Sequence, residues 1–207
     1  MNAPTKIVVI HDGLIPNVDP LLVALRIKFG EENVAHYENS DDGLNYVLEN
    51  INQKIIVVLD INFSKGELSG WEVFKSIREK TALIYIILIT ADELVKLKNE
   101  DLKFLINHDA FALEDVTADY TKIVSLVEDA SHKLNARVDS VLEDWITTQS
   151  KTKREKPYIT TKEGRTYTLD DILESIRQQT DIGKHLERNI LKLAVDLLTR
   201  QKTKLDD

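Results

Sequence analysis

Short runs of β-branched and aliphatic residues alternate with helix-like stretches through residues 1–130. Continuous apolar runs such as KIVVI are typical of parallel strands that are covered on both faces, because a half-exposed strand would alternate apolar and polar residues. The alternation therefore predicts an α/β fold with a doubly wound, five-stranded parallel sheet. We expect its strands at Lys6–Ile10, Val34–Tyr37, Ile55–Leu59, Leu83–Ile89 and Ala110–Leu113.

Helix boundary signals separate these runs. Asp19 followed by Pro20 predicts a helix start, and Gly30 predicts the end of that helix. Ser40 is expected to cap a second helix. Further helices are expected over Trp71–Lys80, over Asp92–Asn107 and from Asp119 onward.

A fold of this class binds ligands at the carboxyl ends of its strands. Those ends carry, in chain order, His11 with Asp12, then Asp60, then Thr90, and last Glu114 with Asp115. No glycine-rich dinucleotide loop follows the first strand, and no phosphate-binding loop ending in Gly-Lys-Ser or Gly-Lys-Thr occurs. Several carboxylates beside a hydroxyl suit a hard divalent cation such as Mg²⁺ next to a phosphoryl group.

Over about residues 5–133 the sequence resembles the receiver domain of two-component response regulators, which has a flavodoxin-like fold. The resemblance rests on five segments in the family's order and spacing, IVVIHD, IIVVLDIN, SGWEVFKSIRE, IILITAD and DAFAL. It implies that Asp60 is the phosphoacceptor and that Asp12, Asp60 and the Asn62 backbone carbonyl hold Mg²⁺. It also implies that Thr90 binds a phosphoryl oxygen and that Phe111 is the aromatic switch residue.

Three departures from the family pattern bear on this chemistry. His11 stands where a first carboxylate is usual, which predicts a weaker metal site. The loop from Asp60 to Gly70 is longer than the common form. Glu114 replaces the family's lysine, whose charge stabilises the acceptor and then the phosphoryl group. Slow phosphorylation is therefore expected, unless another cation such as Lys65 takes that role.

The net charge of −8 is unevenly distributed. Residues 151–207 hold 13 Lys and Arg against 10 Asp and Glu, so residues 1–150 carry −11. An acidic first part argues against nucleic-acid binding there, since it would repel phosphates. The absence of Cys excludes disulfides and thiolate metal sites, and no apolar run approaches the ~20 residues of a membrane span. These features predict a cytoplasmic protein without a membrane partner.

A heptad-like spacing marks the last helix of the receiver-like region. Steps of four and three residues connect Tyr120, Val124, Val127, Ser131, Leu134, Val138, Val141 and Trp145. No Gly or Pro occurs between Asp119 and Gln149, which predicts one continuous helix. Its second half is expected to form a homodimer seam at Leu134, Val138, Val141 and Trp145. The alternative is that this half packs on the C-terminal module.

The C-terminal part begins with a polar, basic stretch that ends in Pro157 and predicts a linker. A hairpin with Gly164 at its turn is expected next, then a helix capped by Thr168 and Asp171. A break over Thr180–Gly183 and a second helix over Lys184–Gln201 complete the expected order. The predicted domains are a receiver-like domain (1–133), a helical extension (134–149), a linker (150–157) and a small α+β or mainly helical module (158–207).

These features favour a response-regulator-like signalling protein with Mg²⁺ as a weakly bound cofactor. Its expected partners are a histidine kinase or phosphotransfer protein and an output protein. A DNA-binding transcriptional regulator is one alternative, although a reading helix would more often expose Arg, Asn or Gln than a continuous apolar stripe. A pseudo-receiver that serves as a dimeric scaffold is another. An independent enzyme is not expected, since no nucleophile–base pair or cofactor loop occurs outside the receiver site.

Overall fold

The computed structural model describes residues 4–51, 53–63, 66–91, 97–115, 119–136, 138–161 and 164–202. The chain divides into two compact units, Met1–Ala136 and Arg137–Asp207. Among the described residues, no helix is both long enough and apolar enough to cross a membrane.

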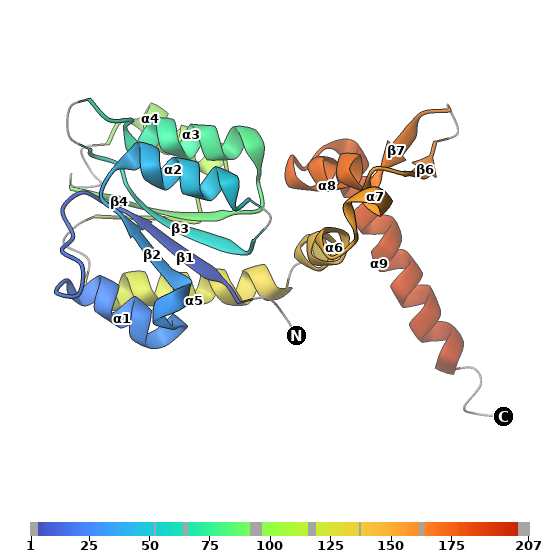
Figure 1. Cartoon of the computed structure of the whole chain (residues 1–207), viewed down its shortest axis with the longest axis horizontal. Helices are drawn as coiled ribbons and strands as arrows, with labels where there is room; N and C mark the ends of the chain where they lie inside the picture. The colour runs from blue at the N-terminus through green and yellow to red at the C-terminus, as the bar shows by residue number, and fades with distance from the viewer. Residues whose placement is uncertain are drawn as a thin grey trace. The chain divides into compact units, whose positions relative to one another are not determined.

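A five-stranded parallel sheet forms the centre of the first unit, with the strand order β2-β1-β3-β4-β5. This confirms the doubly wound sheet predicted from the sequence. Its strands are β1 (Lys6–Ile10), β2 (Val34–Tyr37), β3 (Ile55–Asp60), β4 (Tyr85–Thr90) and β5 (Ala112–Asp115). Helices α1 (Pro20–Phe29) and α5 (Tyr120–Ala136) cover one face of the sheet. Helices α2 (Ser40–Glu49), α3 (Gly70–Lys80) and α4 (Asn99–Asn107) cover the other face, as Figure 1 shows.

The central strands are buried on both sides because their side chains alternate between two cores. Ile7 and Val9 of β1 face the core under α1 and α5. Val8 and Ile10 face the core under α2 and α3. All six residues of β3 are buried. Two-sided burial accounts for the continuous apolar runs in the sequence.

Capping groups start the helices of the first unit. The Asp19 carboxylate accepts a hydrogen bond from the Leu21 N–H at 2.9 Å, which confirms the predicted start of α1. Ser40 was predicted to cap α2, but this prediction is wrong by one residue. The N-cap is Asn39, whose side chain accepts from the Asp42 N–H at 3.0 Å. Ser40 is already helical and fully buried.

Other predicted boundaries also differ from the structure, and β4 begins at Tyr85, two residues later than expected. Strand β5 begins at Ala112, two residues later than expected, so Glu114 and Asp115 lie within the strand. These charged residues are tolerated because β5 is an edge strand that pairs only with β4. Helix α4 begins at Asn99 instead of Asp92, and residues 92–96 lie outside the described part of the chain.

One arginine of α3 fixes the end of the sheet opposite the predicted site. The Arg78 guanidinium donates to the carbonyls of Ile84, His108 and Asp109 at 2.8, 2.8 and 3.0 Å. It also lies over the Phe74 ring, 5.1 Å from the centroid. A planar group with several donors suits such a task, because it satisfies carbonyls from two segments at once.

The predicted continuous helix is described as two helices, α5 and α6 (Val138–Thr147), and Arg137 between them lies outside the described residues. Its unbroken course stays a prediction. Helix α5 packs on α1 and the sheet, whereas α6 packs on helices of the second unit, which agrees with the alternative considered above. Leu134 is only 4% exposed within the core of the first unit. Leu134 is therefore wrongly assigned to a dimer seam, and the Val138 side chain lies outside the described residues.

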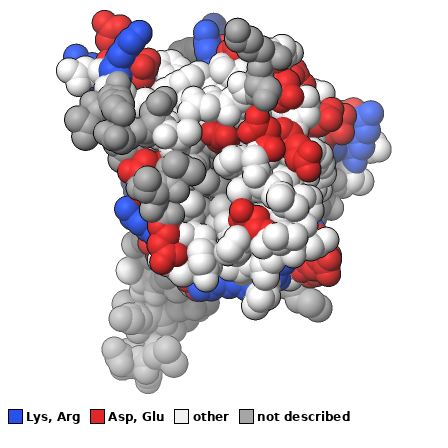
Figure 2. Space-filling view, turned by 90° about the vertical axis from the view of Figure 1, so that its left-hand side faces the viewer, with Lys and Arg blue, Asp and Glu red and all other residues white. Residues whose placement is uncertain are grey.

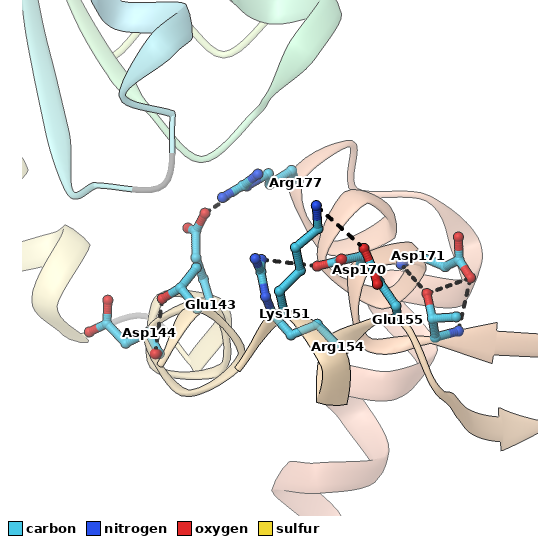
Figure 3. A network of polar contacts seen from close by, with 10 residues as sticks. Glu143, Asp144, Lys151, Arg154, Glu155, Asp170, Asp171 and Arg177 are labelled. Carbon is cyan, nitrogen blue, oxygen red and sulfur yellow. Dashed lines mark hydrogen bonds and ion pairs between the residues drawn. The ribbon is translucent and has the colours of Figure 1, made fainter. Parts of the chain in front are cut away.

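The second unit contains α6, α7 (Lys151–Arg154), the hairpin β6 (Pro157–Thr160) and β7 (Thr166–Thr168), α8 (Leu169–Arg177) and α9 (Asp181–Lys202). The hairpin and the capping box of Thr168 and Asp171 form as predicted. The predicted linker instead contains the short helix α7. Two ion pairs hold α7 and α6 to α8, Arg154–Asp170 at 3.0 Å and Arg177–Glu143 at 2.7 Å (Figure 3).

The predicted break before the last helix is also misplaced. It falls at Gln178–Thr180, where Gln179 has a φ of 51°, and Gly183 lies inside α9. A Cβ at Gly183 would approach the Ser175 carbonyl oxygen to 2.3 Å. Gly183 therefore allows close packing of α9 on α8 and does not interrupt the helix.

Helix α3 begins directly against the end of β3. The Gly70 N–H donates to the Ile61 carbonyl at 3.1 Å, and the Ser69–Glu72 capping box fixes the first turn. A Cβ at Gly70 would lie 2.0 Å from the Asp60 carbonyl oxygen. Only glycine permits this approach without displacing the backbone of Asp60.

We expect Gly70→Ala to destabilise the protein, because the added methyl group collides with backbone and not with a flexible side chain. The free energy of unfolding, measured by urea denaturation and circular dichroism, should fall by about 1–3 kcal/mol. Lys75→Ala, on the exposed side of the same helix, should change it by less than about 0.5 kcal/mol. Equal stabilities of the two variants would contradict the close contact.

Candidate functional site

Three polar side chains meet where β1 and β3 end. His11 and Asp12 follow β1 directly, and Asp60 is the last residue of the neighbouring β3. The His11 Nδ1 lies 3.6 Å from Asp60 Oδ2 and 3.9 Å from Asp12 Oδ1. The strands point toward the left-hand side of Figure 1, and Figure 2 shows Asp and Glu side chains gathered on that face of the molecule. The predicted pair of Asp12 and Asp60 is thus brought together, with His11 as a third member.

Asp60 is a buried acid whose side chain is held by the backbone. The residue is 6% exposed, and its Oδ1 accepts from the Asn62 N–H at 3.0 Å. Burial raises the pKa of Asp60, and the nearby Asp12 carboxylate raises it further. The Asn62 and Ile61 N–H groups and the His11 ring oppose this shift without cancelling it.

The backbone fixes the position of His11. Its N–H donates to the Tyr37 carbonyl at 2.9 Å, and its carbonyl lies 3.0 Å from the His36 Nε2. The Gly13 N–H donates to the His11 Nδ1 at 3.0 Å. A cavity of about 240 Å³, lined in part by Leu14, opens beside the ring.

Thr90 and Glu114 lie on the next two strands of the same edge. Thr90 is fully buried at the end of β4, beside Asp60's strand. Glu114 of β5 pairs in register with Ile89 of β4. Its Oε2 lies 2.7 Å from the Lys122 Nζ of α5. The negative charge that replaces the family's lysine is therefore offset by an ion pair that the sequence analysis did not predict.

Phe111 is not part of this cluster. It precedes β5, and its N–H donates to the Ile86 carbonyl, four residues before Thr90. Its ring contacts Tyr85, with centroids 4.9 Å apart, and the Lys133 ammonium lies 4.8 Å from the ring centroid. Lys65, the predicted substitute cation, lies outside the described residues.

Lys122 was not predicted to belong to the site, and His11 was expected only to weaken the metal site. Lys122 lies in the first turn of α5, eight residues after Glu114. Its position just after the last strand could have indicated a cation near Glu114. His11 directly precedes Asp12, but only the ring orientation shows that it faces both carboxylates. The chemistry of this set fits a divalent cation, because two carboxylates and the Asn62 carbonyl offer oxygen and His11 offers nitrogen.

Solved structures share the fold of the first unit, whereas no family model and no curated protein sequence matches the chain. The signal receiver domain of a Vibrio parahaemolyticus protein matches with a TM-score of 0.50 at 15% identity, covering 71% of this chain and 99% of that one. A response regulator receiver domain protein from Clostridium thermocellum gives 0.50 at 20%, covering 63% and 97%. NtrX from Brucella abortus gives 0.51 at 16%, covering 63% and 27%. The first unit has the receiver-domain fold, which confirms the resemblance seen in its segments.

We expect Asp60→Asn to stabilise the protein in the absence of divalent cations. A raised pKa means that folding disfavours the ionised form, so stability falls as pH rises from the ordinary carboxyl pKa of ~3.9 to the raised value. The variant avoids this loss. At pH 7 with a chelator, its melting temperature should exceed that of the wild type by about 2–4 °C for each kcal/mol regained.

The difference should shrink as pH falls below about 4, where both side chains are neutral. Asp115→Asn, which removes a carboxylate at the end of β5, serves as the control and should give no rise at pH 7. A lower melting temperature for Asp60→Asn at every pH would contradict the raised pKa.

Proposed function

We propose that this chain is a response-regulator-like signalling protein whose Asp60 accepts a phosphoryl group from a histidine kinase or phosphotransfer protein. The observation that carries the proposal is the meeting of Asp60, Asp12 and His11 at the carboxyl edge of a receiver fold. The sequence segments that contain Asp60 and Thr90, IIVVLDIN and IILITAD, follow the family's order and spacing and support the same assignment.

In the proposed reaction, an Asp60 carboxylate oxygen attacks the phosphorus of the donor. The bond from phosphorus to the donor breaks, and the electron pair leaves with the donor. The Asn62 N–H on Oδ1 orients the carboxylate, and the Thr90 hydroxyl, on the neighbouring strand, would bind a phosphoryl oxygen. A divalent cation, Mg²⁺ by the family resemblance, would be held by Asp12, Asp60 and the Asn62 carbonyl and would neutralise phosphoryl charge.

The second unit is proposed as the output module, with a protein as its partner. Six apolar residues of α9 are more than two-fifths exposed, namely Ile182, Leu191, Leu193, Val195, Leu197 and Leu198. An apolar pocket of about 310 Å³ lies between the hairpin and helices α8 and α9, lined by Ile159, Tyr167 and Ile172 among others. Exposed apolar surface of this kind favours a protein over a DNA duplex. We place this activity in the cytoplasm and propose no catalysis of its own.

Incubation with acetyl phosphate should add one phosphoryl group to the wild-type protein by intact-mass measurement. The group should map to Asp60. Asp60→Asn should abolish the addition, because no nucleophile remains, whereas Asp115→Asn should retain it. A wild-type protein that stays unlabelled at every divalent cation tested would overturn the proposal and favour a pseudo-receiver.

The same assay tests the charge at Glu114. Glu114→Gln frees Lys122 from its ion pair, and Glu114→Lys adds a cation at the edge of the sheet. The labelling rate should rise from wild type to the Gln variant and again to the Lys variant. Equal rates in all three proteins would mean that Glu114 does not influence the reaction.

A homodimer through α6 remains part of the proposal. Val141 and Trp145 are 59% and 42% exposed, so they can still contribute to a seam without Leu134. Val141→Lys would place an unpaired charge in that seam and should convert the dimer to a monomer in light scattering. Asp139→Lys, at a sequence position outside the four-three spacing of the seam, should leave the mass unchanged. A wild-type monomer, or unchanged masses in both variants, would exclude this interface.

A further inference from the structure

We propose that His11 is a direct metal ligand and that the site prefers a late first-row transition-metal ion, of the Zn²⁺ and Co²⁺ class, over Mg²⁺. This inference rests on the proposed phosphoacceptor site, because Asp12 and Asp60 supply the remaining side-chain ligands. The possible ligand atoms of the three residues all lie within 4.8 Å of one another.

The distances in this cluster suit a shared ion better than direct hydrogen bonds. Separations of 3.6 Å to Asp60 and 3.9 Å to Asp12 exceed the length of an N–H···O bond. Two bonds of about 2.0–2.2 Å to one ion allow ligand atoms to lie roughly 3–4 Å apart. The His11 ring is therefore already placed at the spacing that coordination requires.

The Gly13 N–H donates to the His11 Nδ1, so an ion that binds Nδ1 takes the place of this hydrogen bond. An unprotonated ring nitrogen cannot bridge to a carboxylate by donating a proton, but it can bind a metal ion. The facing Asp60 carboxylate is more than nine-tenths buried, and the backbone contacts of His11 to Tyr37 and His36 fix the residue from which the ring projects.

Replacement of a carboxylate by imidazole changes which ion the site prefers. Mg²⁺ prefers oxygen ligands and is bound more strongly by negatively charged ones. Relative to the family pattern, His11 removes one carboxylate, and with it one oxygen ligand and one negative charge. Imidazole nitrogen suits Zn²⁺, Ni²⁺ and similar ions, whose affinities for nitrogen-containing sites also exceed those of earlier metals. Two carboxylates, a backbone carbonyl and one imidazole then form a mixed set that a late transition-metal ion accepts.

The test is a titration of the full-length protein with Co²⁺, followed by visible absorption. We expect saturable binding that Zn²⁺ reverses and a large excess of Mg²⁺ does not. His11→Asp, which restores the family carboxylate, should weaken Co²⁺ binding at least about tenfold and let Mg²⁺ displace it. His132→Asp, on the exposed side of α5, should behave as the wild type.

Equal Co²⁺ affinity in wild type and His11→Asp, or displacement of Co²⁺ by Mg²⁺ from the wild type, would overturn the inference. The labelling assay separates this result from the proposed function. If Mg²⁺ supports labelling of Asp60 while His11→Asp leaves Co²⁺ binding unchanged, only the metal inference fails. If Co²⁺ binds through His11 but no ion supports labelling, the metal inference stands and the phosphoacceptor proposal fails.

Discussion

A carboxylate that loses its water on burial has to find donors or cations inside the protein. Asp60 ends a strand whose six residues are all buried. Its substitutes for water are the Asn62 and Ile61 backbone N–H groups. Their positions depend on the parallel pairing of β1 with β3 and on the close start of α3 at Gly70. The remaining raised pKa of Asp60 shows that this compensation is incomplete, and a bound cation would complete it.

The second unit is stabilised in a different way. Its buried apolar residues come mainly from α8 and from Ile146 of α6, which is a small core for a unit of this length. The largely buried pair of Arg177 and Glu143 adds a polar connection between these helices. Much of α9 contributes no burial within the described residues, since its apolar side chains face solvent. Association with another protein would therefore recover hydrophobic free energy that the isolated unit leaves unused.

The sequence was most informative where one local rule determines the structure. Strands β1 and β3 agree with prediction to within one residue, because two-sided burial leaves a continuous apolar run. The bounds of edge strand β5 were predicted wrongly, because a strand that pairs on one side only can include charged residues such as Glu114 and Asp115. Gly183 suggests a helix break locally, yet it serves a contact with Ser175 on another helix. In the site, Asp12 and Asp60 could be found from strand ends alone, whereas the His11 orientation and the Lys122 pair depend on side-chain rotamers and on the packing of α5.

Arg78 joins three elements through one side chain. Its guanidinium connects the start of β4 and the end of α4 to α3. A substitution of Arg78 would take this donor from three carbonyls at once, so its effect would reach the β4 and α4 segments as well as α3 itself.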